Sequence, residues 1–199
     1  MMKAGRGQAM YRIFLKRPFD VLAAFVLLLL VAPILLLTAV LLKLDSPGPI
    51  LFTQKRLGLN GRIFDLYKFR SMVDVPRTPA RQVYGGDPEV TRVGKFIRRF
   101  KIDELPQLLN VLKGDMSIVG PRPCLPDLQA EFDENGRSRI AVRPGLTGLA
   151  QVNGNIFLSW PERWRLDRMY VDNLSFVTDC RILWKTVFVV LLGEKRTVP

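Results

Sequence analysis

Two adjacent acids, Asp103 and Glu104, are the residues of this sequence whose type and position best suit catalysis. They open a predicted helix over 103–113, where the positive end of the helix dipole favours ionised carboxylates. Neighbouring helical residues project about 100° apart, so the pair suits separate roles, one acid as nucleophile and the other as metal ligand or base. The simpler alternative is that Asp103 only caps the helix.

Constrained cations are the second part of a candidate site. Arg122 lies in the run Gly120-Pro121-Arg122-Pro123, where the prolines restrict the backbone on both sides, so its guanidinium is held ready for phosphate oxygens. Lys68 and Arg70 alternate along a predicted strand and point to the same face. The alternatives are an incidental surface arginine and two solvent-exposed edge residues.

Two further residues are weaker candidates for binding phosphate or substrate. Arg143 precedes Pro144 and shares part of the restraint on Arg122, whereas Asp167 is an undistinguished acid in a predicted helix. Histidine is absent, which excludes imidazole catalysis and histidine metal sites. Carboxylates among phosphate-binding cations favour Mg²⁺, with Asp103 and Glu104 as its candidate ligands.

Composition places the chain at a membrane surface. The 199 residues carry a formal net charge of +12, and 48% are hydrophobic, which excludes a disordered tail. No nucleic-acid recognition motif accompanies the charge, so anionic phospholipid or a phosphorylated substrate is the expected partner. Cys124 and Cys180 form no metal-binding or disulfide pattern, and we interpret both as reduced thiols.

The longest apolar run, 21–42, contains no charge and would form a helix of roughly 33 Å, enough to cross a bilayer. Pro33 lies in its middle and is predicted to kink or break the helix. Cations flank both ends of the run, although a spanning helix normally has one cation-rich side. The pattern leaves two alternatives open: a re-entrant segment broken at Pro33 and a kinked spanning anchor.

The fold class predicted from these patterns is α+β and membrane-associated, with a small β-hairpin and several amphipathic interfacial helices. We divide the chain into a basic lead-in (1–18), the membrane segment (19–44) and the remainder (45–199). In the remainder we expect, in order, strands at 50–54 and 62–70, a loop at 74–90, helices at 92–100 and 103–113, an irregular stretch at 114–127, and helices at 161–173 and 179–192.

The ordered motifs of the chain resemble those of the bacterial sugar transferases, the monotopic polyprenyl-phosphate phosphoglycosyl transferases. The resemblance covers nearly the whole chain and corresponds to the minimal catalytic form. It rests on KRPFD (16–20), GPILF (48–52), YKFRSM (67–72), DELPQ (103–107), KGDMS (113–117), VGPRP (119–123), RPG (143–145), QVNG (151–154) and LDRMY (166–170).

The resemblance implies transfer of a sugar-1-phosphate from a UDP-sugar to undecaprenyl phosphate, with Mg²⁺ as cofactor and release of UMP. It implies that Asp103 is the nucleophile, that Glu104 binds the metal or supports the second step, and that Arg122 and Lys68 hold phosphates; Arg70, Arg143 and Asp167 are less secure. It also favours the re-entrant alternative for Pro33, with a catalytic domain on the cytoplasmic face of the bacterial inner membrane. The product would open the membrane steps of exopolysaccharide or lipopolysaccharide synthesis.

Several positions depart from the common family pattern. Ala32 replaces a frequent Ser before Pro33, while Leu149 and Asn155 replace a frequent Trp and Arg and could alter sugar or nucleotide contacts. The rival hypotheses are a non-catalytic scaffold of the same fold and a basic peripheral protein that binds lipid or nucleic acid. The sequence leaves open the sugar, the pathway and whether the chain forms a homodimer.

Overall fold

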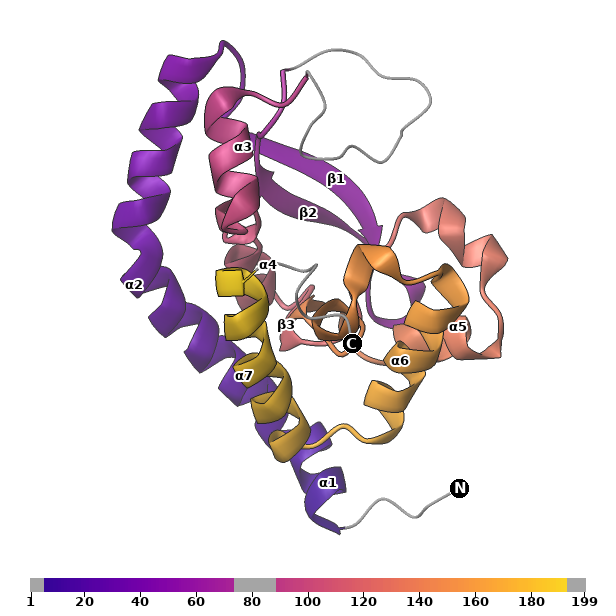
Figure 1. Cartoon of the computed structure of the whole chain (residues 1–199). Helices are drawn as coiled ribbons and strands as arrows, with labels where there is room; N and C mark the ends of the chain where they lie inside the picture. Colours follow the sequence, from indigo (N-terminus) through magenta and orange to yellow (C-terminus); the bar gives the residue numbers. More distant parts are fainter. Residues whose placement is uncertain (1–5, 74–88, 193–199) are drawn as a thin grey trace.

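The computed structural model describes residues 6–73 and 89–192. Its dominant element is a long helical rod, seen in indigo and violet in Figure 1, made of α1 (Arg6–Met10), a π-helical turn (Tyr11–Leu15) and α2 (Lys16–Asp45). By length and composition the rod could cross a membrane, and only 11% of its most apolar stretch is buried. Its exposed side chains include Leu22, Phe25, Leu30 and Leu36, which favours lipid contact.

Pro33 kinks the long helix but does not interrupt it. We expected a kink or a break at this residue, and α2 continues through it from Lys16 to Asp45. The ribbon bends partway along its length, near the α2 label in Figure 1. A proline removes one backbone hydrogen bond and crowds the preceding turn, which bends a helix while the turns on either side hold it together.

Two small sheets complete the scaffold. Strands β1 (Leu51–Leu57) and β2 (Ile63–Phe69) pair antiparallel with Phe52 opposite Lys68, which confirms the predicted hairpin. Strands β3 (Ser117–Val119) and β4 (Gly145–Thr147) pair in parallel within stretches that we expected to be irregular. Each of these strands has three residues, too few for alternation to be recognised in the sequence.

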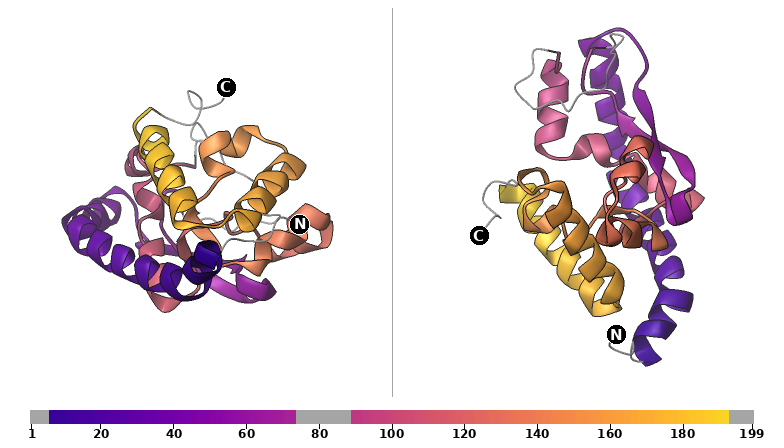
Figure 2. Two further views of the ribbon diagram at one scale, coloured as in Figure 1. Left: turned by 90° about the horizontal axis from the view of Figure 1, so that it is seen from below. Right: turned by 90° about the vertical axis from the view of Figure 1, so that its right-hand side faces the viewer.

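The remaining helices follow the predicted order with shifted ends. They are α3 (Arg92–Arg99), α4 (Gln107–Lys113), α5 (Glu134–Ser138), α6 (Trp160–Asp172) and α7 (Phe176–Leu192). The predicted loop at 74–90 lies mostly outside the described residues. Figure 2 shows α6 and α7 on the side of the molecule away from the β1–β2 hairpin.

The predicted helix start at Asp103 is wrong. A single 3₁₀ turn, Ile102–Glu104, comes first, and α4 begins only at Gln107 with Pro106 as its N-cap. The chain enters the turn through Lys101, which has a left-handed φ of 58°. Asp103 therefore caps no helix and its carboxylate is left for other contacts, whereas Gly114 ends α4 in the left-handed conformation, as predicted.

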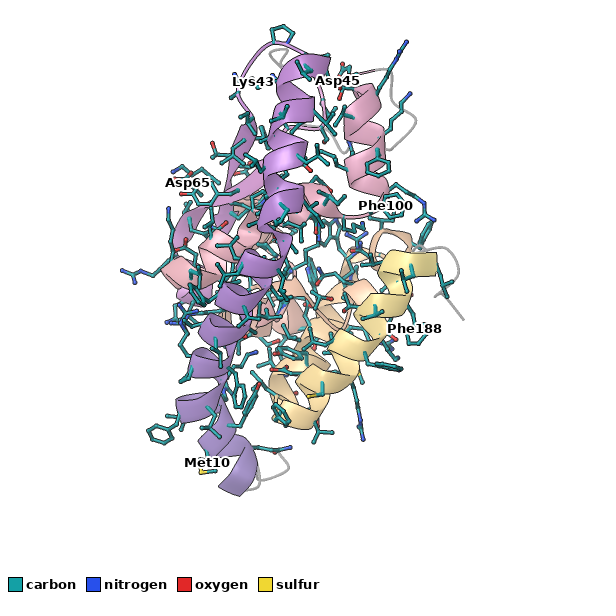
Figure 3. The ribbon with its side chains drawn as sticks, turned by 90° about the vertical axis from the view of Figure 1, so that its left-hand side faces the viewer. Met10, Lys43, Asp45, Asp65, Phe100 and Phe188 are labelled. Carbon is teal, nitrogen blue, oxygen red and sulfur yellow. The ribbon has the colours of Figure 1, made fainter. Side chains whose placement is uncertain are left out.

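Apolar side chains also cover the outer sides of the shorter helices. Phe96 and Phe100 near α3 and Phe188 on α7 are largely exposed, and Figure 3 shows Phe100 and Phe188 on the face that also carries the long helix. Inside, one core cluster joins Ala24 of α2, Leu108 and Val111 of α4, Ile118 of β3 and Ile182 of α7. The membrane helix is thus part of the core.

Glycines allow β3 and β4 to approach closely. A Cβ added to Gly145 would fall on the backbone of Gly120, and one added to Gly120 would lie 2.5 Å from the carbonyl oxygen of Arg143. We expect Gly145→Ala to cost about 2–3 kcal/mol of stability because backbone atoms must move apart. Its thermal midpoint in detergent should fall by roughly 5–10 °C. Gly7→Ala is the control, since its Cβ meets nothing within 4 Å and should leave the midpoint unchanged.

Candidate active site

A buried carboxylate, that of Glu104, is the centre of the candidate site. Lys68 of β2 donates to Glu104 Oε1 at 2.9 Å, and the two terminal nitrogens of Arg122 donate to Oε2 and Oε1 at 3.2 and 2.5 Å. The structure thus brings together Lys68, Glu104 and Arg122 from a strand, a 3₁₀ turn and the loop after β3. A forked pair supported by a second cation fixes the position of Glu104.

Asp103 and Glu104 have opposite electrostatic environments although they are adjacent. Burial raises the pKa of Asp103 above its ordinary value and the neighbouring Glu104 adds to this, while Lys68 partly opposes it. Burial alone would also raise the pKa of Glu104, but Arg122 and Lys68 hold it well below its ordinary range. Glu104 is therefore held in its ionised form by ion pairs with Lys68 and Arg122, whereas the environment of Asp103 disfavours its ionised form.

The Asp103 carboxylate has a free coordination position. Among the residues that the structure describes, its buried Oδ1 accepts no hydrogen bond. Within the same ranges no three Asp, Glu, Cys or His side chains cluster in a way that could hold a metal ion alone. An unpartnered carboxylate oxygen beside a second carboxylate fits Mg²⁺, which binds through one or two carboxylates and the phosphates of a substrate.

The loop that carries Arg122 is held along its backbone. The N–H of Gly120 donates to Thr147 at 2.9 Å, and the carbonyl of Pro121 accepts from Gly145 at 2.9 Å. A terminal nitrogen of Arg139 donates to the carbonyl of Arg122 at 2.5 Å. These bonds and the two prolines restrict the backbone conformation of the loop, as the Gly-Pro-Arg-Pro run predicts.

Asp167 lies behind this loop and not among the phosphate-binding cations. Its carboxylate is only 2% exposed and pairs with Arg139 at 3.2 Å, the residue that holds the Arg122 carbonyl. Burial raises the pKa of Asp167 to about 6, although Arg139 and Arg163 oppose the shift. Asp167 therefore supports the loop through Arg139, and its expected contact with substrate finds no support in the geometry.

Arg70 and Arg143 are engaged elsewhere. The Arg70 guanidinium donates to the carbonyls of Leu42, Ser46 and Pro47 at the end of α2, where it completes the helix terminus. Arg143 Nε donates to the Gly114 carbonyl at 2.9 Å, just beyond α4. Both cations bind carbonyl groups at or just beyond helix ends, a role that their spacing in the sequence does not reveal.

Arg56 is a cation near the site that the sequence analysis missed. Strand register puts it on the same face of the hairpin as Lys68, and it donates to the Pro123 carbonyl at 3.4 Å. Burial lowers the pKa of Arg56 to about 10, and repulsion by Arg122 contributes. Arg56 lies two residues after Gln54, so both side chains point to the same face of the hairpin, and this spacing could have indicated Arg56 from the sequence. Together these cations give the site an excess of positive charge suited to a diphosphate.

Glu104→Gln tests the charge balance of the site. The amide would leave Arg122 and Lys68 without their counter-charge, and we expect a loss of about 2–3 kcal/mol in stability, less than for a wholly buried pair because both cations are partly exposed. Pyrophosphate should recover part of the loss in thermal midpoint by replacing the carboxylate. Exposed Glu131→Gln is the control. An unchanged midpoint for Glu104→Gln would contradict this assignment.

Comparison with known proteins agrees with the motifs. The family model for bacterial sugar transferases matches residues 11–193. The chain is 46% identical over 182 residues to an uncharacterized sugar transferase, EpsL, of Bacillus subtilis, covering 92% of this chain and 90% of that protein. It is 45% identical over 187 residues to the UDP-N-acetylgalactosamine-undecaprenyl-phosphate N-acetylgalactosaminephosphotransferase of Aeromonas hydrophila, and 46% identical over 191 residues to the undecaprenyl-phosphate glucose phosphotransferase of Komagataeibacter xylinus.

The last two proteins are longer. The matches cover 90% and 92% of this chain but only 44% and 36% of those proteins. The family match, residues 11–193, runs through the Asp103–Glu104 site and through most of the long apolar helix. The chain belongs to the bacterial sugar transferase family.

Proposed function

We propose that this chain transfers a sugar-1-phosphate from a UDP-sugar to undecaprenyl phosphate, forming an undecaprenyl-diphosphate sugar for the synthesis of a surface polysaccharide. The observation that carries the proposal is the buried Asp103 carboxylate, one oxygen of which has no partner among residues 6–73 and 89–192, next to a Glu104 that Lys68 and Arg122 hold in place. The similar proteins of Aeromonas and Komagataeibacter, whose names state this reaction for two sugars, support the reaction class.

The reaction proceeds in two displacements. A carboxylate oxygen of Asp103 attacks the β-phosphorus of the UDP-sugar, a new O–P bond forms, and the bond to the bridging oxygen breaks to release UMP. A phosphate oxygen of the polyprenyl phosphate then attacks the phosphorus of the aspartyl phosphosugar, and the Asp103 carboxylate leaves. Splitting the transfer in this way lets one site handle a water-soluble donor and a lipid acceptor in turn.

The cations stabilise the charge that develops on the phosphoryl oxygens. Arg122 offers a planar fork at a fixed place, and Lys68 adds a compact positive charge from the hairpin. Mg²⁺ would be held by Asp103 and by the phosphates of the donor, with Glu104 as a further ligand only where it gives up a bond to Lys68 or Arg122, and it would neutralise the diphosphate. Glu104 holds Lys68 and Arg122 close to Asp103.

We further propose that the long helix is re-entrant and that the catalytic domain faces the cytoplasm. Near its start, Arg17 donates to carbonyls of α4; at its end, Asp45 accepts from the N–H of Val93 at the start of α3. Both ends are thus bonded to one domain, whereas the two ends of a spanning helix face opposite sides of the bilayer. The bend near Pro33 suits a helix that dips into one leaflet and returns.

The covalent route predicts a burst. Incubated with its UDP-sugar and Mg²⁺ but no lipid acceptor, the protein should release about one equivalent of UMP, and Asp103 should gain the mass of a phosphosugar. Asp103→Asn should abolish the burst and lower turnover by at least about a thousandfold, because an amide is a poor nucleophile. The control is Asp172→Asn on exposed α6. Full turnover by Asp103→Asn with an unmodified native Asp103 would refute the route.

Labelling tests the re-entrant topology. In a background without Cys124 and Cys180, a cysteine at Gln8 should react with a membrane-impermeant maleimide only from the cytoplasmic side, as a cysteine at Arg62 in the hairpin turn does. Such a result would place positions 8 and 62 on the cytoplasmic side, where UDP-sugars are found. Reaction of Gln8→Cys from the periplasmic side alone would establish a spanning helix.

A further inference from the structure

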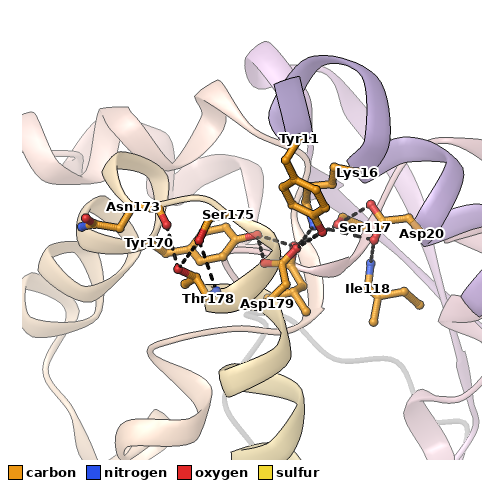
Figure 4. A network of polar contacts seen from close by, with 11 residues as sticks. Tyr11, Lys16, Asp20, Ser117, Ile118, Tyr170, Asn173, Ser175, Thr178 and Asp179 are labelled. Carbon is orange, nitrogen blue, oxygen red and sulfur yellow. Dashed lines mark hydrogen bonds and ion pairs between the residues drawn. The ribbon is translucent and has the colours of Figure 1, made fainter. Parts of the chain in front are cut away.

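The first turns of α2 bind a network of buried polar residues that the proposed reaction does not use. Lys16 donates to Asp179 Oδ2 at 2.8 Å, and Asp20 accepts from the Ser117 hydroxyl at 2.7 Å and from the N–H of Ile118 at 3.1 Å. Figure 4 shows these side chains converging from the membrane helix, β3 and α7. Asp20 and Asp179 are 6% and 5% exposed.

Asp20 acts on the strand that leads to Arg122. From Ser117 to Arg122 the backbone is held mainly by backbone partners in or near β4, such as Ser117 to Pro144 and Gly120 to Thr147. The N–H of Ile118 points the other way, and its partner is the Asp20 carboxylate of the membrane helix. Ile118 lies four positions before Arg122, so the contact fixes the base of the loop that carries Arg122.

Arg17 acts on the other half of the site. One of its terminal nitrogens donates to the carbonyl of Val111 at 2.7 Å, and the other donates to that of Leu112 at 3.2 Å. These carbonyls belong to the last turn of α4, where a cation complements the helix dipole. The opposite end of α4, Gln107, lies three positions after Glu104, so holding one end of the helix helps to set the place of the turn before the other end.

We propose that Arg17 and Asp20 are positioning residues that align the two halves of the active site on the membrane helix, Arg17 through α4 and Asp20 through β3. They lie three residues apart and share one face of α2. An effect of Arg17 and Asp20 on catalysis rests on the proposed function. Their contacts with α4 and β3 do not depend on it. Placement of the long helix in the bilayer is thereby coupled to the distance between Asp103 and Arg122.

Stability alone gives a weak reason for such a network. Buried ion pairs are often replaced by apolar residues at no loss of stability, because the free energy of desolvation offsets the attraction. Apolar residues cannot form directional hydrogen bonds. The Asp20 carboxylate accepts from two donors of β3, and the Arg17 guanidinium donates to two successive carbonyls of α4. Directional bonds fix the orientation of a strand and a helix that apolar packing would leave free to slide.

Hydrogen exchange tests the alignment without depending on the reaction. In Asp20→Ala we expect amides of 117–122 to exchange at least about tenfold faster than in the native protein, while 134–138 stays unchanged. Asp20→Asn retains an acceptor for the Ile118 N–H and should restore most of the protection. Asp172→Asn, an exposed carboxylate on α6, is the control. Unchanged exchange at 117–122 in Asp20→Ala would overturn the proposal.

A double-mutant cycle tests the catalytic consequence. If Asp20 acts through Arg122, then Asp20→Ala should lower kcat about tenfold or more in the native background but less than about threefold after Arg122→Lys has released the fork. Arg165→Lys in place of Arg122→Lys should leave the effect of Asp20→Ala undiminished, since Arg165 is exposed on α6. Equal losses in both backgrounds would mean that Asp20 is merely structural. A native protein that releases no UMP would count against the proposed function, while the exchange result would still decide the alignment.

Discussion

A buried carboxylate needs a counter-charge, and the architecture of this site follows from how Glu104 obtains one. Its cations come from β2 and from the loop after β3, so both segments must meet the 3₁₀ turn that carries Glu104. An uncompensated charge at this depth would cost several kcal/mol, more than a small fold can lose. Glu104 therefore connects the separate sheets around Asp103, whose Oδ1 accepts no hydrogen bond from the described residues.

The same constraint explains the surroundings of Arg122. Arg122 neutralises Glu104, and the backbone that carries it is restrained from several directions. Prolines limit the loop, Gly120 and Gly145 let β3 and β4 approach, and the Asp167–Arg139 pair holds the carbonyl of Arg122 from behind. The catalytic value of a guanidinium depends on its being in place before charge develops.

The sequence indicated most of the residues that meet in the candidate site, but not the contacts that hold the other candidates elsewhere. Asp103, Glu104, Lys68 and Arg122 were found because each has a local signal: adjacent acids before a helix, alternation along a strand, or prolines around an arginine. Arg70, Arg143 and Asp167 have similar local signals, but tertiary contacts decide their roles, since the partners of Arg70 and Arg143 are carbonyls at helix ends and that of Asp167 is an arginine 28 positions earlier. Residue types do not reveal which backbone groups a fold leaves unpaired.

The errors in the predicted elements have the same origin. The helix expected from Asp103 begins at Gln107 because Pro106 occupies its N-cap and Lys101 turns the chain into a 3₁₀ turn, so neither acid lies in the first turn of that helix. Burial and cations set the two environments instead. Likewise, Lys16 and Arg17 looked like a basic flank for lipid headgroups, yet they bond to Asp179 and to the end of α4. Cations at the start of a long apolar helix can thus bond to the domain that carries the candidate site.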